Sequence, residues 1–472
     1  MDKEMKKREP RAPKFWEALA VFAFIIFVII LTLNYKVGMQ TPMILGCMIA
    51  VIFAMYLGYD WKSIEAGILD GMKSALPAIP ILMLVGMLVG VWILGGTIPS
   101  IIYYGLKYIT PGFLVPLTFI MCSITSVATG TSFGSIATVG LAFFGVGIAM
   151  GVPAGLMAGA VASGAFFGDK MSPMSDTTNV APAMSGCTLY EHIGSMIYTT
   201  APATVICLIL YGILGARFGK GAIDLSNISL IMETLDGRFH ISAVTLLLPI
   251  LVIGMSACKV PSYKSLGIGV IVSAVFAMAL QGVDFKAVVA ATMQGFKSDT
   301  GIAQVDTILT RGGINMMAST ITMLLAATAM GGVLEKCQLL KTIIDTLMQW
   351  IKSYTGLILV TMLGTAATAA ASGNMVLTLI LPGKTFSPAY EKMNIHGKVL
   401  SRTMEDIGTL GLVLIPWTNP AIYLMSTLGV DTSYIPYTFL SLIVPIFAII
   451  FAFTGIAVWD REGKSVRGRK AA

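Results

Sequence analysis

The sequence predicts an all-helical polytopic membrane protein made of two inverted repeats with re-entrant hairpins and broken helices. Charged residues make up only 12% of the 472 residues, hydrophobic residues make up 56%, and the mean hydropathy is +0.84. The stretch Tyr108–Gly168 runs for 61 residues without Asp, Glu, Lys or Arg. A membrane helix needs about 20 apolar residues. A water-soluble enzyme carries about 25% charged residues, so this composition excludes that class of protein.

An internal repeat divides the chain into two units. Gly58–Ser74 matches Gly282–Ser298 at seven of 17 positions with an offset of 224 residues, and the same offset relates the apolar spans before them. Two short amphipathic helices could match by composition alone, but the shared offset argues against this. The predicted parts are a basic tail (1–14), a first transmembrane unit (15–216), a linker (217–238), a second transmembrane unit (239–457) and a second basic tail (458–472).

Each unit is expected to contain the same elements in the same order. Three spans come first, at 15–33, 40–58 and 78–97, and again at 239–257, 263–281 and 315–334. An uncharged segment with a small, polar centre follows at 111–150 and 356–383. A helix interrupted by polar residues (153–190 and 396–427) and a closing span (192–216 and 434–457) complete each unit.

The number of crossings and the positive charges agree on the orientation. A hairpin that enters and returns adds an even number of crossings, so each unit crosses an odd number of times and the two units must be inverted, as in many secondary transporters. With both termini cytoplasmic, the inner segments hold 22 Lys and Arg residues and the outer segments hold eight. This excess on one side is the positive-inside pattern.

Two polar clusters lie at predicted membrane depth. The first runs from Gly168 to Asn179 and contains Asp169, Lys170 and Asp176 around Pro173. Proline breaks the helical ladder, and irregular backbone at this depth is tolerated only beside a cavity. Carboxylates, hydroxyls and carbonyls together suit a small hard cation. A short cytoplasmic loop is the alternative interpretation.

The second cluster lies at the matching place in the other unit. A carboxylate pair, Glu405 and Asp406, precedes a break bracketed by Pro416 and Pro420. A cytoplasmic loop is a stronger alternative here, because Lys398 and Arg402 stand just before it. The centres of the two uncharged segments, 128–134 and 371–375, read as hairpin tips, although close packing of helices through small residues would use the same residue types.

The motif Gly168-Asp-Lys-Met-Ser-Pro-Met-Ser-Asp-Thr-Thr178 resembles the NhaC family of sodium/proton antiporters, and Glu405-Asp406 and Pro416-Trp417 are similar to that family's second-half pattern. The resemblance implies a dimeric antiporter of the cytoplasmic membrane that exchanges Na⁺ for H⁺ by alternating access, with no cofactor. Some relatives exchange malate and lactate and others carry amino acids, so an organic substrate stays open. A channel or a membrane-embedded enzyme fits the sequence less well, and the six scattered cysteines indicate neither disulfides nor a zinc site.

The predicted site combines acidic residues with neutral oxygen ligands. Asp169, Asp176, Glu405 and Asp406 are expected to carry the cation and the proton, with Na⁺ at Asp169, Asp176, Thr131, Ser132 and Thr178. We expect Asp176 to meet Thr131 and Ser132 and to bind H⁺ and Na⁺ in competition, and Lys170 to balance Asp169 and Asp176. The other candidate ligands are neutral: Thr129, Ser172, Ser175, Thr177, Asn179, Ser372, Asn374, Thr418 and Asn419.

Overall fold

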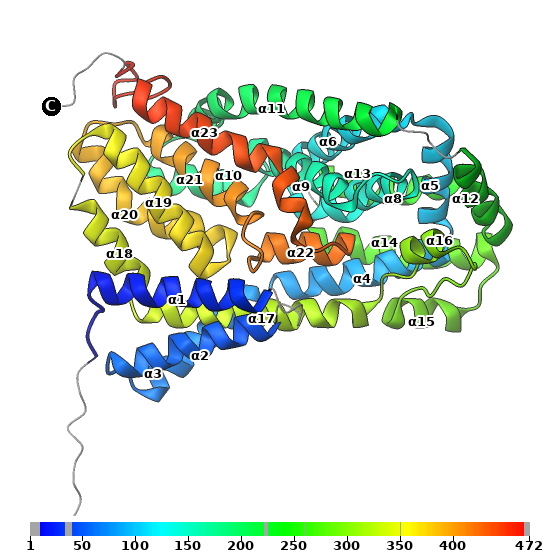
Figure 1. Cartoon of the computed structure of the whole chain (residues 1–472), viewed down its shortest axis with the longest axis horizontal. Coiled ribbons are helices and arrows are strands. Elements are labelled where there is room, and N and C mark those ends of the chain that lie inside the picture. The colour runs from blue at the N-terminus through cyan, green and yellow to red at the C-terminus, as the bar shows by residue number, and fades with distance from the viewer. Residues whose placement is uncertain (1–9, 34–39, 221–224, 259, 350, 467–472) are drawn as a thin grey trace, which may run out of the picture.

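The computed structural model describes residues 10–33, 40–220, 225–258, 260–349 and 351–466, and in these ranges its elements are helices joined by short turns (Figure 1). Six of the helices in these described ranges are long and apolar enough to cross a membrane, and the number rises to eight if each of two bent helix pairs counts as one span. Large apolar side chains such as Ile52, Ile271 and Phe453 are about two-thirds exposed, as expected for a surface that faces lipid. The protein is therefore a multi-pass membrane protein.

The helices of the first unit follow the predicted order. They are α1 (Phe15–Leu33), α2 (Gln40–Tyr56), α3 (Trp61–Ala75), α4 (Ala78–Leu94), α5 (Thr97–Tyr108), α6 (Pro111–Thr129), α7 (Ser132–Ser135), η1 (Ile136–Gly140), α8 (Leu141–Ala149), α9 (Ala154–Met171), α10 (Asp176–Ser185) and α11 (Leu189–Lys220).

The helices of the predicted second unit follow the predicted linker, most of which is a helix packed against α5. The remaining elements are α12 (Leu225–Arg238), η2 (Ala243–Leu246), α13 (Leu247–Ala257), α14 (Ser262–Gln281), α15 (Phe285–Gln294), α16 (Ala303–Leu309), α17 (Ile314–Lys336), α18 (Leu339–Met348), α19 (Tyr354–Ser372), α20 (Met375–Lys392), α21 (Gly397–Leu412), α22 (Asn419–Leu428), η3 (Thr432–Tyr437) and α23 (Phe439–Thr454).

The repeated sequence folds in the same way in both units. Asp60 caps α3 by accepting a hydrogen bond from the Ser63 amide at 3.1 Å, and Asp284 caps α15 by accepting one from the Ala287 amide at 2.8 Å. These caps lie 224 residues apart, the offset of the sequence repeat. A carboxylate at this position satisfies an amide that would otherwise lack a partner at the start of the helix. The two matching segments therefore begin their helices in the same way.

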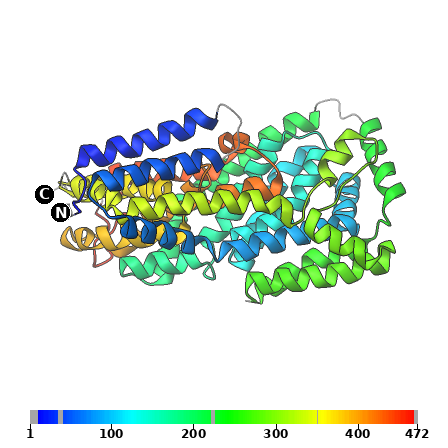
Figure 2. The ribbon, with the colours of Figure 1, turned by 90° about the horizontal axis from the view of Figure 1, so that it is seen from below.

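The two units exchange their amphipathic helices. Helix α3 packs against α17 of the second unit, and α15 packs against α4 of the first. A Cβ atom on Gly71 would lie 2.1 Å from the Thr328 carbonyl oxygen, and one on Gly90 would lie 2.3 Å from the Ala291 carbonyl oxygen. Only glycine permits this approach of two backbones, as at other tightly packed membrane helix pairs. Figures 1 and 2 show that α1 begins and α23 ends at the same end of the molecule.

The central helices turn or stop at the residues where the sequence predicts hairpin tips and helix breaks. Helices α6 and α8 pack against each other and turn at Gly130, while α19 and α20 turn at Gly373; both glycines have a left-handed backbone conformation, with φ of 70° and 61°. The first broken helix consists of α9 and α10 with a gap at 172–175, and the second of α21 and α22 with a gap at 413–418. Pro173 and Pro416 lie in these gaps, which explains why the helices stop there.

The relative orientation of the units can be tested by labelling. Lys62 and Lys286 are equivalent exposed residues near the starts of α3 and α15. In a background without the six native cysteines, Lys62→Cys and Lys286→Cys are expected to react with a membrane-impermeant maleimide from opposite sides of the membrane, because an inverted repeat places equivalent residues on opposite faces. Labelling of both from the same side would contradict the inversion.

Candidate functional site

A cavity of about 1350 Å³ lies where the hairpin turns meet the helix breaks. Both units line it, since Thr131, Ser132 and Asp169 come from the first and Asn374 and Asn419 from the second. Its wall also includes residues of α3 and of the end of α17. The irregular backbone at the turns and breaks thus borders open space, as backbone at membrane depth requires.

Each hairpin turn is attached to the neighbouring break by a similar hydrogen bond. The Ser172 hydroxyl donates to the Val127 carbonyl at 2.8 Å, and the Trp417 indole nitrogen donates to the Ala370 carbonyl at 2.7 Å. Each of these carbonyls lies three residues before the glycine of its turn. In the second unit the Asn419 amide also donates to the Gly373 carbonyl at 2.9 Å. These bonds satisfy carbonyls at helix ends and fix the turns against the breaks.

Asp169 lies in the last turn of α9, just before the first break. Its side chain is 5% exposed and accepts a hydrogen bond from the Ser132 hydroxyl at 2.6 Å and from the Ser175 hydroxyl at 2.5 Å. Ser132 belongs to the hairpin turn and Ser175 to the gap that follows α9. Ser175 also contacts the Thr177 hydroxyl at 3.0 Å. The hydroxyls of two different elements therefore converge on one buried carboxylate at the cavity wall.

Asp176 occupies a different position from the one predicted. It is exposed, begins α10 and lines the cavity, whereas Ser132 bonds to Asp169 instead. The prediction that Asp176 contacts Ser132 is therefore wrong, because the break at 172–175 separates the two aspartates and Ser132 binds the first of them.

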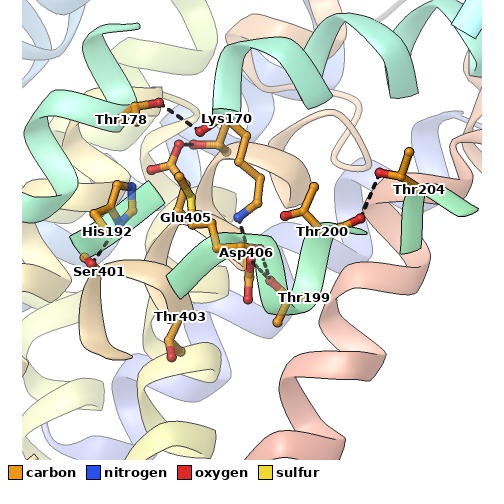
Figure 3. Close-up of polar contacts among 12 residues, drawn as sticks. Lys170, Thr178, His192, Thr199, Thr200, Thr204, Ser401, Thr403, Glu405 and Asp406 are labelled. Atoms are coloured by element: carbon orange, nitrogen blue, oxygen red, sulfur yellow. Dashed lines mark hydrogen bonds and ion pairs between the residues drawn. The ribbon is translucent and has the colours of Figure 1, made fainter. Parts of the chain in front are cut away.

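Lys170 is also not placed as the sequence suggests. Its ammonium nitrogen lies 2.5 Å from Asp406 of the second unit, both side chains are fully buried, and Thr199 donates to the same carboxylate oxygen at 3.0 Å (Figure 3). The expectation that Lys170 balances Asp169 and Asp176 is therefore wrong, because Lys170 pairs with Asp406. Successive residues of a helix point in different directions, so Asp169 faces the cavity while Lys170 faces α21. Two buried charges of opposite sign compensate each other across the unit boundary.

Glu405 is buried beside this pair, and it is not among the described residues that line the cavity. Its Oε1 accepts a hydrogen bond from Thr409 at 2.8 Å, while Oε2 has no hydrogen-bond partner among the described residues, although Thr177 faces the same carboxylate. Lys170 and Asp169 lie within electrostatic range of it. Glu405 and Asp406 lie inside α21, so the interpretation of this cluster as a cytoplasmic loop is wrong.

The neutral candidates fall into two groups. In the part of the chain that the structure describes, Thr129 and Asn419 line the cavity, and Thr129 Oγ1 and Asn419 Oδ1 are buried without a hydrogen-bond partner. The others form helix caps, close the breaks or bond within the site. Thr131 and Asn374 cap the helices after the turns, Thr178 binds the Asp169 and Lys170 carbonyls, Asn179 binds those of Pro173 and Ser175, Thr418 binds that of Leu412, and Ser372 contacts Thr378.

The donor set suits a weakly held cation rather than a fixed metal centre. Within the described ranges no three His, Cys, Asp or Glu side chains come close enough together to hold a metal ion. A single carboxylate with hydroxyl and amide oxygens is a hard-oxygen environment with low total charge. Such a site can bind and release a monovalent cation during a transport cycle.

Comparison with known proteins identifies the family. The model of the Na⁺/H⁺ antiporter family matches residues 12–168 and 164–456, which together cover almost the whole chain. The chain belongs to the Na⁺/H⁺ antiporter family. As a member of this family it is a secondary antiporter and not an enzyme.

Relatives with different substrates are about equally similar to this antiporter. The malate-2H⁺/Na⁺-lactate antiporter of Bacillus subtilis is 35% identical over 98% of this chain and 99% of its own. The Na⁺/H⁺ antiporter NhaC of Alkalihalophilus pseudofirmus is 36% identical over 90% of this chain and 92% of its own. The arginine/ornithine antiporter ArcD of Halobacterium salinarum is 33% identical over 96% of this chain and 94% of its own. Sequence identity therefore does not choose among these substrates.

Sequence reasoning missed the polar residues of α11 in this antiporter. His192, Ser195 and Thr199 are buried, and they recur at spacings of three and four residues in a mostly apolar helix. This spacing places them on one face. This spacing was visible in the sequence, but the α21 residues that His192 and Thr199 contact could be identified only in the structure.

Proposed function

We propose that the protein exchanges Na⁺ for H⁺ across the cytoplasmic membrane by alternating access, with Asp169 as the Na⁺-binding carboxylate. The observation that supports this is the buried Asp169 carboxylate at the cavity wall, held by hydroxyls of the hairpin turn and the break. The neutral ligands that we assign to this site are Ser132, Ser175, Thr129 and Asn419, which all line the cavity. The side-chain oxygens of Thr129 and Asn419 have no hydrogen-bond partner among the described residues. Hard oxygen ligands are those that Na⁺ prefers.

Competition at one carboxylate would couple the two ions. When Asp169 is protonated it has no charge to offer Na⁺, and when Na⁺ binds, the proton must leave. The same carboxylate then carries either ion to the other side but never both, which gives exchange without a leak. Asp176 at the cavity adds negative charge that attracts a cation, and Glu405 and Asp406 provide acidic groups beyond the cavity wall.

The residues in the cavity wall support an inward-open conformation, in which the cavity opens to the cytoplasm. Its wall includes Asp70, Glu335 and Lys336, which belong to segments that the excess of Lys and Arg assigns to the inner side. We propose that both termini lie on that side and that the antiporter is a homodimer, as the family resemblance implies. The mass of the detergent-solubilised protein measured by light scattering tests the dimer.

An organic anion is the second candidate substrate, and the size of the cavity favours it. A volume of about 1350 Å³ is far larger than a bare cation needs. It exceeds the about 300–1,000 Å³ that is usual for small-molecule sites, so it has room for an organic anion. The amide ends of α10 and α22 and the Asn419 side chain could hold a carboxylate without an arginine.

Transport by the purified protein in proteoliposomes separates these functions. We expect an outward proton gradient to drive Na⁺ uptake with no organic solute present, because the proposed site binds Na⁺ directly. Uptake that requires malate or lactate would favour the second candidate. Uncoupled current without exchange would contradict both proposals and indicate a channel.

A further inference from the structure

The cavity that contains Asp169 ends at the hairpin turns, and other residues separate it from the outer side of the protein. Among the described residues of α17, those that line the cavity run from Thr328 to Lys336, near the end of this helix. Of the described residues of α22, only Asn419, the first, lines it. The segment before α17 belongs to the side that the distribution of Lys and Arg assigns to the outside. The rest of α22 and the start of α17 therefore lie between the cavity and the outer side.

An aromatic pair closes the cavity where α22 begins. Phe133 of the hairpin turn lines the cavity, and its ring stacks on the ring of Tyr423 of α22, with centroids 4.4 Å apart and planes inclined by 23°. The Tyr423 hydroxyl donates to the Phe133 carbonyl at 3.0 Å, and Tyr423 is only 2% exposed. Stacked aromatic pairs of this kind are stabilising. Rings this close leave no space for water between them, so the pair blocks the path at this point.

A second contact lies further toward the outer side. The hydroxyls of Thr320 on α17 and Ser426 on α22 are 2.5 Å apart. Thr320 precedes Thr328, the first residue of α17 in the cavity wall, by eight positions. At a rise of 1.5 Å per residue this is about 12 Å along the helix axis. The two helices are thus joined well beyond the end of the cavity.

Arg311 holds the last turn of α22 without an acidic partner. Its guanidinium donates to the Leu428 carbonyl and lies over the Phe144 ring of α8, 5.6 Å from the ring centroid. None of the ion pairs among the described residues includes Arg311. Carbonyls at the end of a helix carry partial negative charge, which favours a cation there. A hydrogen bond and a cation–π contact are each weaker than a buried ion pair, so this attachment can open and form again.

We propose that these three contacts of α22 form the outer gate of the antiporter and that Arg311 is its latch. The proposal rests on the proposed exchange by alternating access and names the residues that close the outer side while the cavity is open to the inner side. Figure 1 shows α16, which leads to Arg311, on the side of α22 away from the end where α1 begins. The positive charge of Arg311 also opposes the leak of cations through the closed gate. The gate consists of Tyr423 with Phe133, Ser426 with Thr320, and Leu428 with Arg311.

The first test measures how readily the gate opens. In a background without the native cysteines, Ser426→Cys is treated in intact cells with a membrane-impermeant maleimide, and the rate of labelling is measured. Arg311→Met removes the hydrogen bond from the guanidinium. Because a hydrogen bond from a charged group changes an equilibrium by about 10-fold or more, we expect labelling to become about 10-fold faster. An unchanged or slower rate would overturn the gate.

Arg238 provides a matched control for this test. Its Nη2 also donates to a backbone carbonyl, that of Asp299, at 3.2 Å, but this bond is exposed and its acceptor does not belong to α22. Arg238→Met should therefore leave the labelling of Ser426→Cys unchanged. An equal increase for Arg238→Met and Arg311→Met would show a general loosening of the outer segments and would contradict the role of Arg311 as a latch.

A disulfide across the gate tests the proposal in the opposite direction. Because the Thr320 and Ser426 hydroxyls are 2.5 Å apart, Thr320→Cys and Ser426→Cys should form a disulfide on oxidation. The link should stop Na⁺/H⁺ exchange in proteoliposomes, and a reducing agent should restore it. Calorimetric titration of the linked protein in detergent should give the wild-type Na⁺ affinity, since the cavity stays open to the inner side. Failure to form the link, or exchange that continues after it forms, would contradict the gate. Wild-type protein without any Na⁺/H⁺ exchange would instead contradict the proposed function, while the labelling rates would still test the gate.

Discussion

Asp169→Asn is expected to abolish Na⁺/H⁺ exchange. Asparagine keeps the shape of the side chain, and it can accept a hydrogen bond from one of the two serine hydroxyls through Oδ1 and donate to the other through Nδ2, but it carries no charge and does not titrate. Direct charge pairing in a partly desolvated site contributes several kcal/mol, and each 1.4 kcal/mol is a tenfold change in affinity, so Na⁺ binding should weaken by at least about 100-fold. Calorimetric titration of Na⁺ at several pH values measures both the affinity and the number of protons released.

Asp176→Asn is the matched control for this prediction. Of the four acidic residues described around the cavity, Asp70, Asp169, Asp176 and Glu335, Asp169 is buried and the others are exposed. We expect Asp176→Asn to weaken Na⁺ binding only slightly, because the charge of an exposed group is screened by water and salt. If Asp176→Asn had the larger effect, Asp176 would be the coupling carboxylate and the role given to Asp169 would be wrong.

Lys170→Met is expected to destabilise the protein by about 3–5 kcal/mol, because it leaves the Asp406 carboxylate buried without its partner. The effect should appear as a lower midpoint of thermal unfolding in detergent. The double variant Lys170→Met with Asp406→Leu removes both charges and should recover most of the stability, since a buried ion pair can often be replaced by apolar side chains without loss.

Lys73→Met provides the comparison for an exposed pair. Lys73 lies 2.8 Å from Asp70, and both side chains are about two-thirds exposed. Exposed ion pairs contribute between 0 and about 1 kcal/mol, so this substitution should hardly change the midpoint. A similar loss for Lys73→Met and Lys170→Met would show that the buried pair has no special structural role.

Local signals in the sequence were sufficient to predict the turns and breaks. Gly130 and Gly373 end helices in a left-handed conformation, and Pro173 and Pro416 stop the hydrogen-bond ladder, so each feature depends on residues close in the chain. The position of Asp169 at one of these breaks was predicted for the same reason.

Contacts between the units could not be predicted in this way. Lys170 and Asp406 are 236 residues apart, and their pairing depends on how α9 and α21 cross and which faces they present. The sequence analysis expected Asp176, and not Asp169, to contact Ser132, and this error has a similar cause. The break at residues 172–175 decides which of the two carboxylates becomes buried. Spacing along the chain contains no such information.

The crossed packing of α3 on α17 and of α15 on α4 has a consequence for the origin of the molecule. Each half places a helix against the backbone of the other half at closely approaching glycines, so the two halves interlock. An arrangement of this kind is what two domain-swapped copies of a shorter ancestor would keep after their genes were joined. It follows that the halves made as two separate polypeptides in one cell should find each other and assemble, with the connecting segment dispensable for recognition.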